Sequence, residues 1–234
     1  LFRQIPNYRN LSSMTMKLSE NTFNLLKNFS GINQSISVKS GNTIRTISVA
    51  ENILAEADVE ETFPKNFSIY DLNEFLGGMS LMRGADMEFG SDHYVKIKNN
   101  RSAIKYFFAD SSLIKQAPDQ GIKVPSADVN FVLSESDIQS LTRAAAVYQL
   151  PDFSVIGDGT DVTVVVRDKE NDTSNTFSIN VGKTDDEFVL NMKVENLKLI
   201  KGDYDVVMSK RLISRFTNKS IPVTYWIALE PDSN

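Results

Sequence analysis

The chain of 234 residues contains no cysteine and only one histidine, His93. The lack of cysteine excludes a disulfide framework, a thiol nucleophile and a cysteine-ligated metal, and makes the cytoplasm the expected compartment. One histidine cannot supply a histidine-based catalytic triad or a multi-histidine metal site within a subunit. His93 follows Ser91 and Asp92 in a polar run that is typical of a hairpin turn. The sequence therefore gives little support to enzymes that depend on these side chains.

Long hydrophobic runs are also absent, since no stretch approaches the roughly 18 consecutive apolar residues of a membrane-spanning helix. Hydrophobic residues still make up 41% of the chain, which suffices for the cores of one or two domains. The formal net charge is −5, so the chain as a whole would repel free nucleic acid. We expect no membrane partner and no cofactor.

One sequence pattern occurs twice, about 115 residues apart. Leu18-Ser19-Glu20 and Leu133-Ser134-Glu135 each precede apolar residues at helical spacing, and the register continues from Ile36-Ser37-Val38 to Phe153-Ser154-Val155. A period of this length matches a small domain rather than a solenoid repeat. The chain is therefore predicted to contain two copies of one fold. Chains of duplicated domains that associate head to tail can close into rings.

The predicted domains are an extension or tail over 1–15, a first copy over 16–116, a connector over 117–126 and a second copy over 127–234. The extension carries two arginines and no acid and shows little periodicity, so it is left out of the predicted fold. The connector contains two prolines and one glycine, which is typical of an extended segment with little strand structure.

Each copy is predicted to be α+β, with two helices and about eight strands in mostly antiparallel sheets. Ser19 is the expected N-cap of the first helix, and an apolar face predicts a further helix over 71–81. In the second copy a short helix is expected over 194–200. The predicted strands of the first copy are 32–39, 43–49, 53–59, 62–69, 86–90, 93–98 and 102–108. Those of the second copy are 127–133, 153–157, 161–167, 175–181, 187–192, 203–208, 212–217 and 223–230.

The first helix of each copy has an outer face that is neutral to basic, although the protein is acidic. The inner faces are predicted to carry Phe23, Leu26 and Phe29 in the first copy and Ile138, Leu141, Ala145 and Tyr148 in the second. The outer faces are predicted to carry Asn24, Asn28, Gln139, Arg143 and Ala146, with Lys27 on the flank. Acidic residues are confined to the first turns, where the helix dipole favours them. An ordinary solvated helix face and a surface that meets an anion both remain open.

Three short motifs imitate ligand sites. Gly182-Lys183-Thr184 resembles the end of a phosphate-binding loop, but Phe177 stands where that loop requires glycine, so a turn is expected. Asp158-Gly159-Thr160-Asp161 has too few ligands for an EF-hand and is expected to be a hairpin turn. The acidic residues of 185–187, with those at 203 and 205, could hold magnesium, but solvated loop ends explain them more simply. We expect no metal site.

Several segments in order resemble the DNA sliding clamps of large tailed phages, which are related in fold to proliferating-cell nuclear antigen. They are Met16-Lys17-Leu18-Ser19, Leu25-Leu26-Lys27-Asn28-Phe29, Val38-Lys39-Ser40-Gly41, the run Ile69-Tyr70-Asp71-Leu72-Asn73-Glu74-Phe75-Leu76-Gly77, and the ending Tyr225-Trp226-Ile227-Ala228-Leu229-Glu230. No single segment is a signature, and the similarity covers about residues 16–232. The resemblance implies two clamp-type domains per chain and a head-to-tail homotrimeric ring around double-stranded DNA, with helices lining the hole.

The resemblance also implies a function without catalysis. Such a ring tethers the replicative DNA polymerase and raises its effective concentration at the primer end. An ATP-driven clamp loader places the ring on DNA, and in some members RNA polymerase engaged in late transcription is a further partner. DNA contacts would be weak and independent of sequence, so that the ring slides. The location would be the cytoplasm of a host cell.

Within this family interpretation, three sets of residues are candidates. The DNA-facing candidates are Lys17, Lys27, Arg143, Lys193 and Lys198. The candidates for an apolar pocket that accepts partner tails are Val38, Ile122, Val124, Pro222, Ala228 and Leu229. The subunit interface would pair strand 102–108, with Ile104, Tyr106 and Phe108, with strand 175–181 of the next chain, with Phe177, Ile179 and Val181.

Two other function classes are compatible with the sequence. A duplicated structural or assembly protein of a virion would have the same internal repeat and would occur in purified particles. A carboxylate-dependent hydrolase would titrate a divalent metal and turn over a substrate, neither of which is expected of a clamp.

Overall fold

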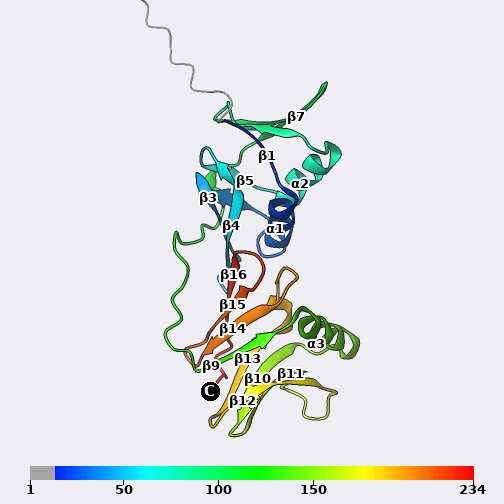
Figure 1. The fold of residues 1–234 in the computed structure, drawn as a ribbon, viewed down its shortest axis with the longest axis vertical. Coiled ribbons are helices and arrows are strands. Elements are labelled where there is room, and N and C mark those ends of the chain that lie inside the picture. The colour runs from blue at the N-terminus through cyan, green and yellow to red at the C-terminus, as the bar shows by residue number, and fades with distance from the viewer. Residues whose placement is uncertain (1–13) are drawn as a thin grey trace, which may run out of the picture. The chain divides into compact units, whose positions relative to one another are not determined.

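The computed structural model describes residues 14–234 (Figure 1). The predicted extension over 1–15 therefore lies outside the described residues, except for Met14 and Thr15. Thr15 is the first residue of a strand, so the ordered fold begins slightly earlier than the sequence pattern suggested.

The chain divides into two compact units. Among the described residues, the first contains 14–46 and 58–116, and the second contains 47–57 and 117–234. The segment 47–57, which the repeat pattern assigned to the first copy, thus belongs to the second unit. Strand β4 (Ile53–Phe63) begins in the second unit and ends in the first.

The first unit contains two α-helices and short antiparallel sheets. Its elements are β1 (Thr15–Lys17), α1 (Glu20–Ser30), β2 (Ile36–Val38), β3 (Gly41–Ile47), the end of β4, β5 (Phe67–Ile69), α2 (Leu72–Leu81), β6 (Asp86–Glu88), β7 (Tyr94–Asn99), β8 (Ser102–Phe107) and a 3-10 turn at Ser111–Leu113. One sheet has the order β1-β6-β7-β8, β2 pairs with β5, and β3 lies beside β4.

The second unit contains one α-helix and two larger sheets. Its elements are β9 (Val129–Leu133), α3 (Glu135–Tyr148), β10 (Asp152–Asp158), β11 (Asp161–Arg167), β12 (Phe177–Lys183), β13 (Glu187–Lys193), a 3-10 turn at Val194–Asn196, β14 (Tyr204–Ser209), β15 (Ile213–Asn218) and β16 (Val223–Ala228). One sheet has the order β12-β11-β10-β13, and the other runs β4-β16-β15-β14-β9.

The two units repeat the same order of elements, which confirms the predicted duplication. The sheet β1-β6-β7-β8 corresponds to β9-β14-β15-β16, and β2 beside β5 corresponds to β10 beside β13. Even hydrogen bonds recur. Ser37 contacts Ser68 at 2.8 Å between hydroxyl oxygens, and at the equivalent position Ser154 donates to Asn191 Oδ1 at 2.6 Å. Gly41, the first residue of β3, and Gly159, shortly before β11, both adopt a positive φ, of 115° and 84°.

Each unit has its own hydrophobic core. In the first unit the α-helices cover one face of the sheet strands, and the almost fully buried side chains include Phe29, Ile36, Ile44, Ile69, Leu72, Met87, Phe89, Val95 and Ile97. In the second unit they include Leu133, Leu141, Phe153, Val155, Val164, Val166, Leu190, Met192, Tyr204, Phe216, Tyr225 and Ile227. Burial of each such side chain stabilises the fold by about 1.5–3 kcal/mol, so the two cores account for most of the favourable free energy.

The helix starts follow from side-chain caps. The Ser19 hydroxyl accepts a hydrogen bond from Thr22 N, which confirms Ser19 as the N-cap of α1. Ser134 forms a capping box with Asp137 at the start of α3, and Asp71 caps α2 by accepting from Glu74 N. The predicted helix over 71–81 is therefore confirmed.

The predicted helix over 194–200 is wrong. Only a 3-10 turn forms at Val194–Asn196, directly after β13, so the second unit has one α-helix rather than two. The Val194 N–H donates to Pro151 O and the Leu197 N–H donates to Val194 O, which commits the segment to a tight turn. Its apolar residues do not form a stripe long enough to favour a helix over these contacts.

The predicted inner faces of α1 and α3 need two corrections. Leu25, not assigned to the inner face of α1, is only 3% exposed, and Tyr148, assigned to the inner face of α3, is 49% exposed. Tyr148 is the last residue of α3, where Gln149 leaves the helix with a left-handed backbone.

Strand predictions were accurate in place but not in length. Strand 161–167 is confirmed, and most others shift by one to three residues. The predicted strands 53–59 and 62–69 correspond instead to a long β4 and a separate β5. Pro64 follows the end of β4 and has no N–H for a sheet hydrogen bond, which explains the break.

Candidate nucleic-acid interface

Helix α1 presents a polar face to solvent. Thr22, Leu25, Leu26 and Phe29 are buried, while Asn24 and Lys27 are exposed on the other side. The helix has its only acidic residue, Glu20, in the first turn. The exposed surface of α1 beyond that turn is therefore neutral to basic, as the sequence predicted.

Helix α3 has the same distribution of charge. Its acids, Glu135 and Asp137, lie in the first turn, and Arg143 is exposed further along the helix. Neither Lys27 nor Arg143 forms an ion pair with a carboxylate in the part of the chain that the structure describes. Both cations are therefore available to an anionic partner.

The other predicted DNA-facing cations lie outside helices. Lys17 is on β1, and its Nζ lies 2.8 Å from Asp86 Oδ1 and also donates to Gly84 O at 2.8 Å. Lys198 is exposed in the loop after the 3-10 turn. Lys193 ends β13, where its Nζ lies 3.0 Å from the buried Asp152 carboxylate and 3.4 Å from Glu230. The hydrogen bond to Asp152 raises the pKa of Lys193, so this ammonium already has internal partners.

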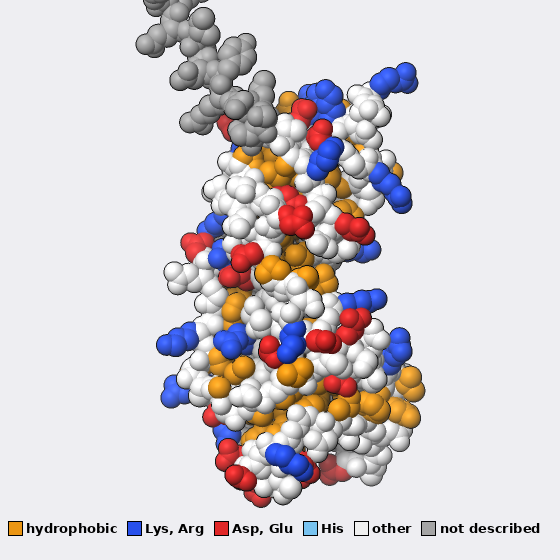
Figure 2. All heavy atoms as spheres, viewed as in Figure 1, with side chains coloured by type: hydrophobic (Ala, Val, Ile, Leu, Met, Phe, Trp, Pro, Cys, Tyr) orange, Lys and Arg blue, Asp and Glu red, His pale blue; other side chains and the backbone are white. Residues whose placement is uncertain are grey.

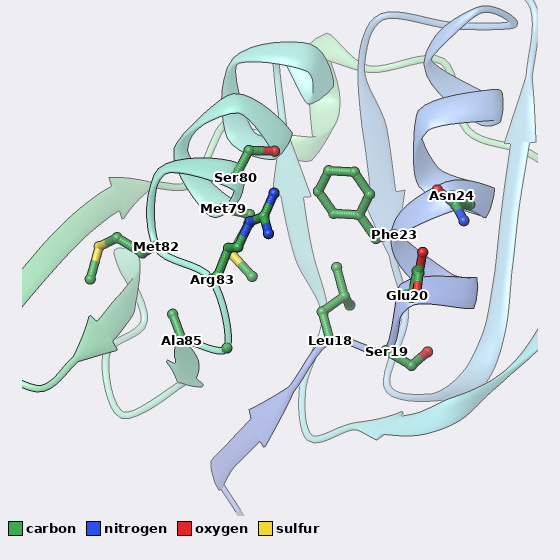
Figure 3. A pocket seen from close by; sticks show the side chains of 11 residues that line it. Leu18, Ser19, Glu20, Phe23, Asn24, Met79, Ser80, Met82, Arg83 and Ala85 are labelled. Atoms are coloured by element: carbon green, nitrogen blue, oxygen red, sulfur yellow. The ribbon is translucent and has the colours of Figure 1, made fainter.

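A hollow lies between the start of α1 and the end of α2, entirely within the first unit. Its volume is about 590 Å³, and Leu18, Phe23 and Met79 form its apolar wall. In Figure 3 the Arg83 side chain extends from the loop after α2 into the space facing Phe23 on α1. Arg83 is an exposed cation that sequence reasoning did not select, because nothing in its local sequence indicates that two helices meet there.

Charge on the visible surface is mixed. Figure 2 shows Lys and Arg side chains interspersed with Asp and Glu, without one continuous basic area on that face. This agrees with the net charge of −5 and with weak rather than tight attraction to a free polyanion.

The two strands proposed for the subunit interface are both edge strands. β8 ends the order β1-β6-β7-β8, and β12 ends the order β12-β11-β10-β13. In β12 the half-buried Phe177, Ile179 and Val181 alternate with polar or small residues. In β8 the half-buried residues are Ile104 and Tyr106, and Phe108 lies just past the strand end.

Tyr106 fixes the inner face of β8 against α2. Its ring packs on Phe75 with centroids 5.2 Å apart, and its hydroxyl donates to Asp71 O at 3.1 Å. Burial, with the nearby Glu74 carboxylate, raises the pKa of Tyr106 to about 12. The side chain therefore stays neutral at physiological pH.

The residues predicted to form a partner pocket differ in accessibility. Ile122 is 41% exposed, Pro222 is exposed, and Val124 and Ala228 are half-buried. Leu229 is 6% exposed, and Val38, which belongs to the first unit, is 3% exposed. Leu229 and Val38 are thus core residues in this structure and offer little surface to a partner.

The structure explains the ligand-like motifs as ordinary chain turns and strand ends. His93 is exposed in the bend before β7, and Asp158 accepts from Thr160 N and Asp161 N in the β10–β11 turn, as expected. Gly182 and Lys183 are the last residues of β12 rather than part of a turn. Residues 14–234 contain no cluster of three or more His, Cys, Asp or Glu suited to a metal ion. No helix of that region is long and apolar enough to cross a membrane.

Comparisons with known proteins assign this architecture. Residues 17–115 match the family model described as DNA polymerase processivity factor, and residues 130–231 match the model described as gp45 sliding clamp, C terminal. The sliding clamp of Vibrio phage KVP40 is 32% identical over 222 residues, covering 92% of this chain and 99% of the relative. The chain belongs to the phage sliding clamp family. The sliding clamp of Enterobacteria phage T4 is also 32% identical, covering 93% of this chain and 98% of the relative.

Solved structures of other clamps share the fold at much lower identity. Proliferating-cell nuclear antigen of A. fulgidus, solved with the C-terminal region of FEN-1, matches with a TM-score of 0.68 at 13% identity, covering 94% of this clamp and 99% of that chain. The antigen of Entamoeba histolytica matches with a TM-score of 0.66 at 11% identity, covering 93% and 99%. The predicted family and clamp-type α+β fold are therefore confirmed. The clamp is a DNA polymerase processivity factor of a non-enzymatic family.

Proposed function

We propose that three copies of this clamp close head to tail into a ring around duplex DNA and hold a replicative DNA polymerase at the primer end. The observation that carries this proposal is a strand pairing within the chain. β16 pairs antiparallel with the first part of β4, and β8 and β12 are the equivalents of these strands. Both equivalents lack a neighbour on one edge, so a second copy can supply the missing pairing.

The internal pairing also predicts the register of the interface. Ile97 on β7 is equivalent to Phe216 on β15. Ile97 is paired with Ile104 on β8, and Phe216 is paired with Tyr225 on β16, so Ile104 corresponds to Tyr225. Tyr225 is paired with Ala55 of β4.

The residue of β12 that corresponds to Ala55 follows from the hairpin before β4. Counted from the equivalent Gly41 and Gly159, Ser48 corresponds to Val166, which is paired with Phe177 at the start of β12. Ser48 N donates to Ile53 O at 2.9 Å, so Ile53 corresponds to Phe177. Ala55 then corresponds to Ile179. Ile104 of one copy should therefore face Ile179 of the next, and Tyr106 should face Phe177, which places apolar side chains opposite each other across the interface.

For DNA, the polar faces of α1 and α3 are the proposed lining, with Lys27 and Arg143 as the main phosphate contacts. Lys17, Lys198 and Arg83 are additional candidates, whereas Lys193 is the weakest because two carboxylates already hold it. A ring that encloses DNA needs only weak contacts, which allow it to slide. A net charge of −5 per chain is compatible with such topological retention.

For partners, we propose that short tails dock beside the connector, on the accessible residues Ile122, Val124 and Pro222. The A. fulgidus relative binds the C-terminal region of FEN-1, which gives a precedent for tail binding by this fold. Apolar anchors of a short tail suffice for such recognition. We also propose that an ATP-driven clamp loader places the ring on DNA and that RNA polymerase engaged in late transcription is a further partner. The proposed location is the cytoplasm of a host cell.

Two measurements test the proposed function. Light scattering of the purified protein should give a mass near three times 26.2 kDa. The variant Lys27→Glu/Arg143→Glu should keep that mass but reduce processive synthesis on primed DNA at moderate salt, where the contacts are only partly screened. Lys210→Glu/Arg211→Glu, which reverses two exposed cations in the turn after β14, is the matched control for the change in charge. A monomeric mass would reject the ring, and unchanged processivity would reject the two helices as the DNA lining.

A further inference from the structure

The outer face of the β1-β6-β7-β8 sheet carries charged and aromatic side chains that no described element covers. The registers place the following residues on this face: Thr15, Lys17, Asp86, Glu88, Tyr94, Lys96, Lys98, Ala103, Lys105 and Phe107. Their neighbours along the strands, including Met87, Val95 and Ile97, are at most 1% exposed on the opposite face. We call this set of ten residues the outer basic face.

Two lysines on this face lie directly opposite each other. Lys96 on β7 is the cross-strand partner of Lys105 on β8, and Lys98 is two residues away on β7. Like charges in directly opposite positions destabilise a sheet, so their presence needs a compensating benefit. None of the three lysines forms an ion pair within residues 14–234.

Aromatic side chains lie beside these lysines. The rings of Tyr94 and Phe107 are edge to face with centroids 5.5 Å apart, and Lys105 Nζ lies 4.9 Å from the centre of the Tyr94 ring. Phe107 is 64% exposed. A surface pocket of about 350 Å³ opens next to this pair, and its lining includes Tyr94, Lys96, Glu88 and Met14.

The second unit shows how the equivalent face is used. The pair Lys96–Lys105 corresponds to Arg215–Trp226 on β15 and β16. Trp226 is only 7% exposed because the connector crosses it, and a Cβ on Gly121 would lie 2.6 Å from the indole ring. An extended chain segment therefore covers this position in the second unit, while the same position in the first unit is open.

We propose that the outer basic face binds an extended, acidic segment of a partner protein with an apolar anchor. The lysines would meet its carboxylates, and the anchor would enter the pocket beside Tyr94 and Phe107. Asp86 and Glu88 lie among the lysines and would repel a uniform polyanion such as DNA, which favours a polypeptide. The chain's own residues 1–13 contain two arginines and no acid, so they do not complement the face.

The probe is a fluorescent peptide about ten residues long, rich in Glu and carrying Leu anchors, because short tails bind such surfaces with few anchors. Its anisotropy should rise with the full-length clamp and fall with added salt. The variant Lys96→Ser/Lys98→Ser, on an inner strand, should weaken binding about tenfold or more, as should Lys105→Glu. Phe107→Ala should weaken it as well. Lys210→Glu and a peptide with Gln in place of Glu are the controls.

The thermal midpoint and mass distinguish a docking role from a structural one. Lys105→Glu removes the repulsion with Lys96 and also the contact with the Tyr94 ring, so the midpoint should change little while peptide binding weakens about tenfold or more. Because Lys105 is on the edge strand β8, Lys105→Glu could also change the mass of the assembly. In that case Lys96→Ser/Lys98→Ser decides the result, since β7 is not an edge strand.

Several outcomes would overturn the proposal. The wild-type clamp could fail to bind the peptide, or all variants could bind it equally. A chain without residues 1–13 could bind much more tightly than the full chain, which would make that segment the occupant. A linear duplex could displace the peptide and itself lose affinity in Lys105→Glu, which would make the face a DNA contact.

Discussion

At the scale of single residues, a buried carboxylate joins the start of one helix to a strand that is remote in sequence. Glu61 on β4 is 8% exposed, and its carboxylate accepts hydrogen bonds from Ser19 N and Thr22 Oγ1 at the start of α1. Burial disfavours the charged carboxylate, but the two hydrogen bonds outweigh it and lower the pKa of Glu61. The sequence predicted Ser19 as a cap but not this partner, which is 42 residues away. Local patterns identify caps and cannot show long-range pairing.

Glu61→Gln should destabilise the clamp by about 1–3 kcal/mol, because the buried Ser19 and Thr22 donors lose a charged acceptor. The pKa of Glu61 is lower in the folded than in the unfolded chain. Its stabilisation is therefore present above the unfolded pKa of about 4.3 and is lost as the pH falls through the folded pKa. Urea unfolding at neutral pH and below pH 4 measures both effects. An equal loss of stability for the variant at both pH values would contradict the assigned role.

Leu229 and Ile122 should respond oppositely to the same substitution. Leu229 is buried and its N–H donates to Leu212 O, so Leu229→Asp should cost about 3 kcal/mol or more through an uncompensated buried charge. Ile122 is 41% exposed, so Ile122→Asp should change stability by less than about 0.5 kcal/mol. Stimulation of the polymerase should nevertheless fall with Ile122→Asp. Thermal melting and primer extension separate the two results, and normal stimulation by a folded Ile122→Asp clamp would place tail docking elsewhere.

At the scale of elements, the sequence specified the fold where periodicity was long and failed where packing decided. The strand 161–167 was predicted with its observed bounds, because alternating valines fit one buried face. The helix over 194–200 was not formed, since hydrogen bonds to Pro151 and within the turn ended it after three residues. The candidate cations were harder still. Lys193 has the right charge, but its carboxylate partners Asp152 and Glu230 are remote in sequence.

The interface register can be tested by cross-linking, because the clamp contains no cysteine. In the variant Ile104→Cys/Ile179→Cys, the two Cβ atoms should face each other across the β8–β12 pairing, about 4.5–5.5 Å apart. Oxidation or a short thiol cross-linker should then join three chains into a closed covalent ring that persists in denaturant. Ile104→Cys/Val181→Cys, shifted by two residues, is the control and should cross-link poorly. Equal yields from both variants, or no trimers from the first, would reject the predicted register.

A proline in the edge strand tests whether the pairing itself holds the ring. Ser178→Pro removes a backbone donor on the free edge of β12, because the register turns the N–H of Ile179 towards β11 and that of Ser178 away from it, and should give monomers by light scattering. Far-ultraviolet circular dichroism serves as the control for folding, since β10, β11 and β13 would still pair. A trimer that survives this substitution with its fold intact would show that the chains associate through other elements.

At the scale of the whole molecule, charge and topology make different predictions about DNA binding. Each chain has a net charge of −5, so an assembled ring has little electrostatic affinity for DNA outside its hole. Retention should therefore depend on enclosure, with Lys27 and Arg143 only easing the passage of phosphates.

Clamps loaded on nicked circular DNA should stay bound when salt is raised, because salt weakens phosphate contacts but does not open the ring. Cutting the circle once should release them, since the ring can then slide off an end. Lys27→Glu/Arg143→Glu should load more slowly but show the same contrast between circular and linear DNA. Gel filtration of labelled clamp with each DNA measures retention, and equal loss from circles and linear molecules would mean that contacts, not enclosure, hold the clamp.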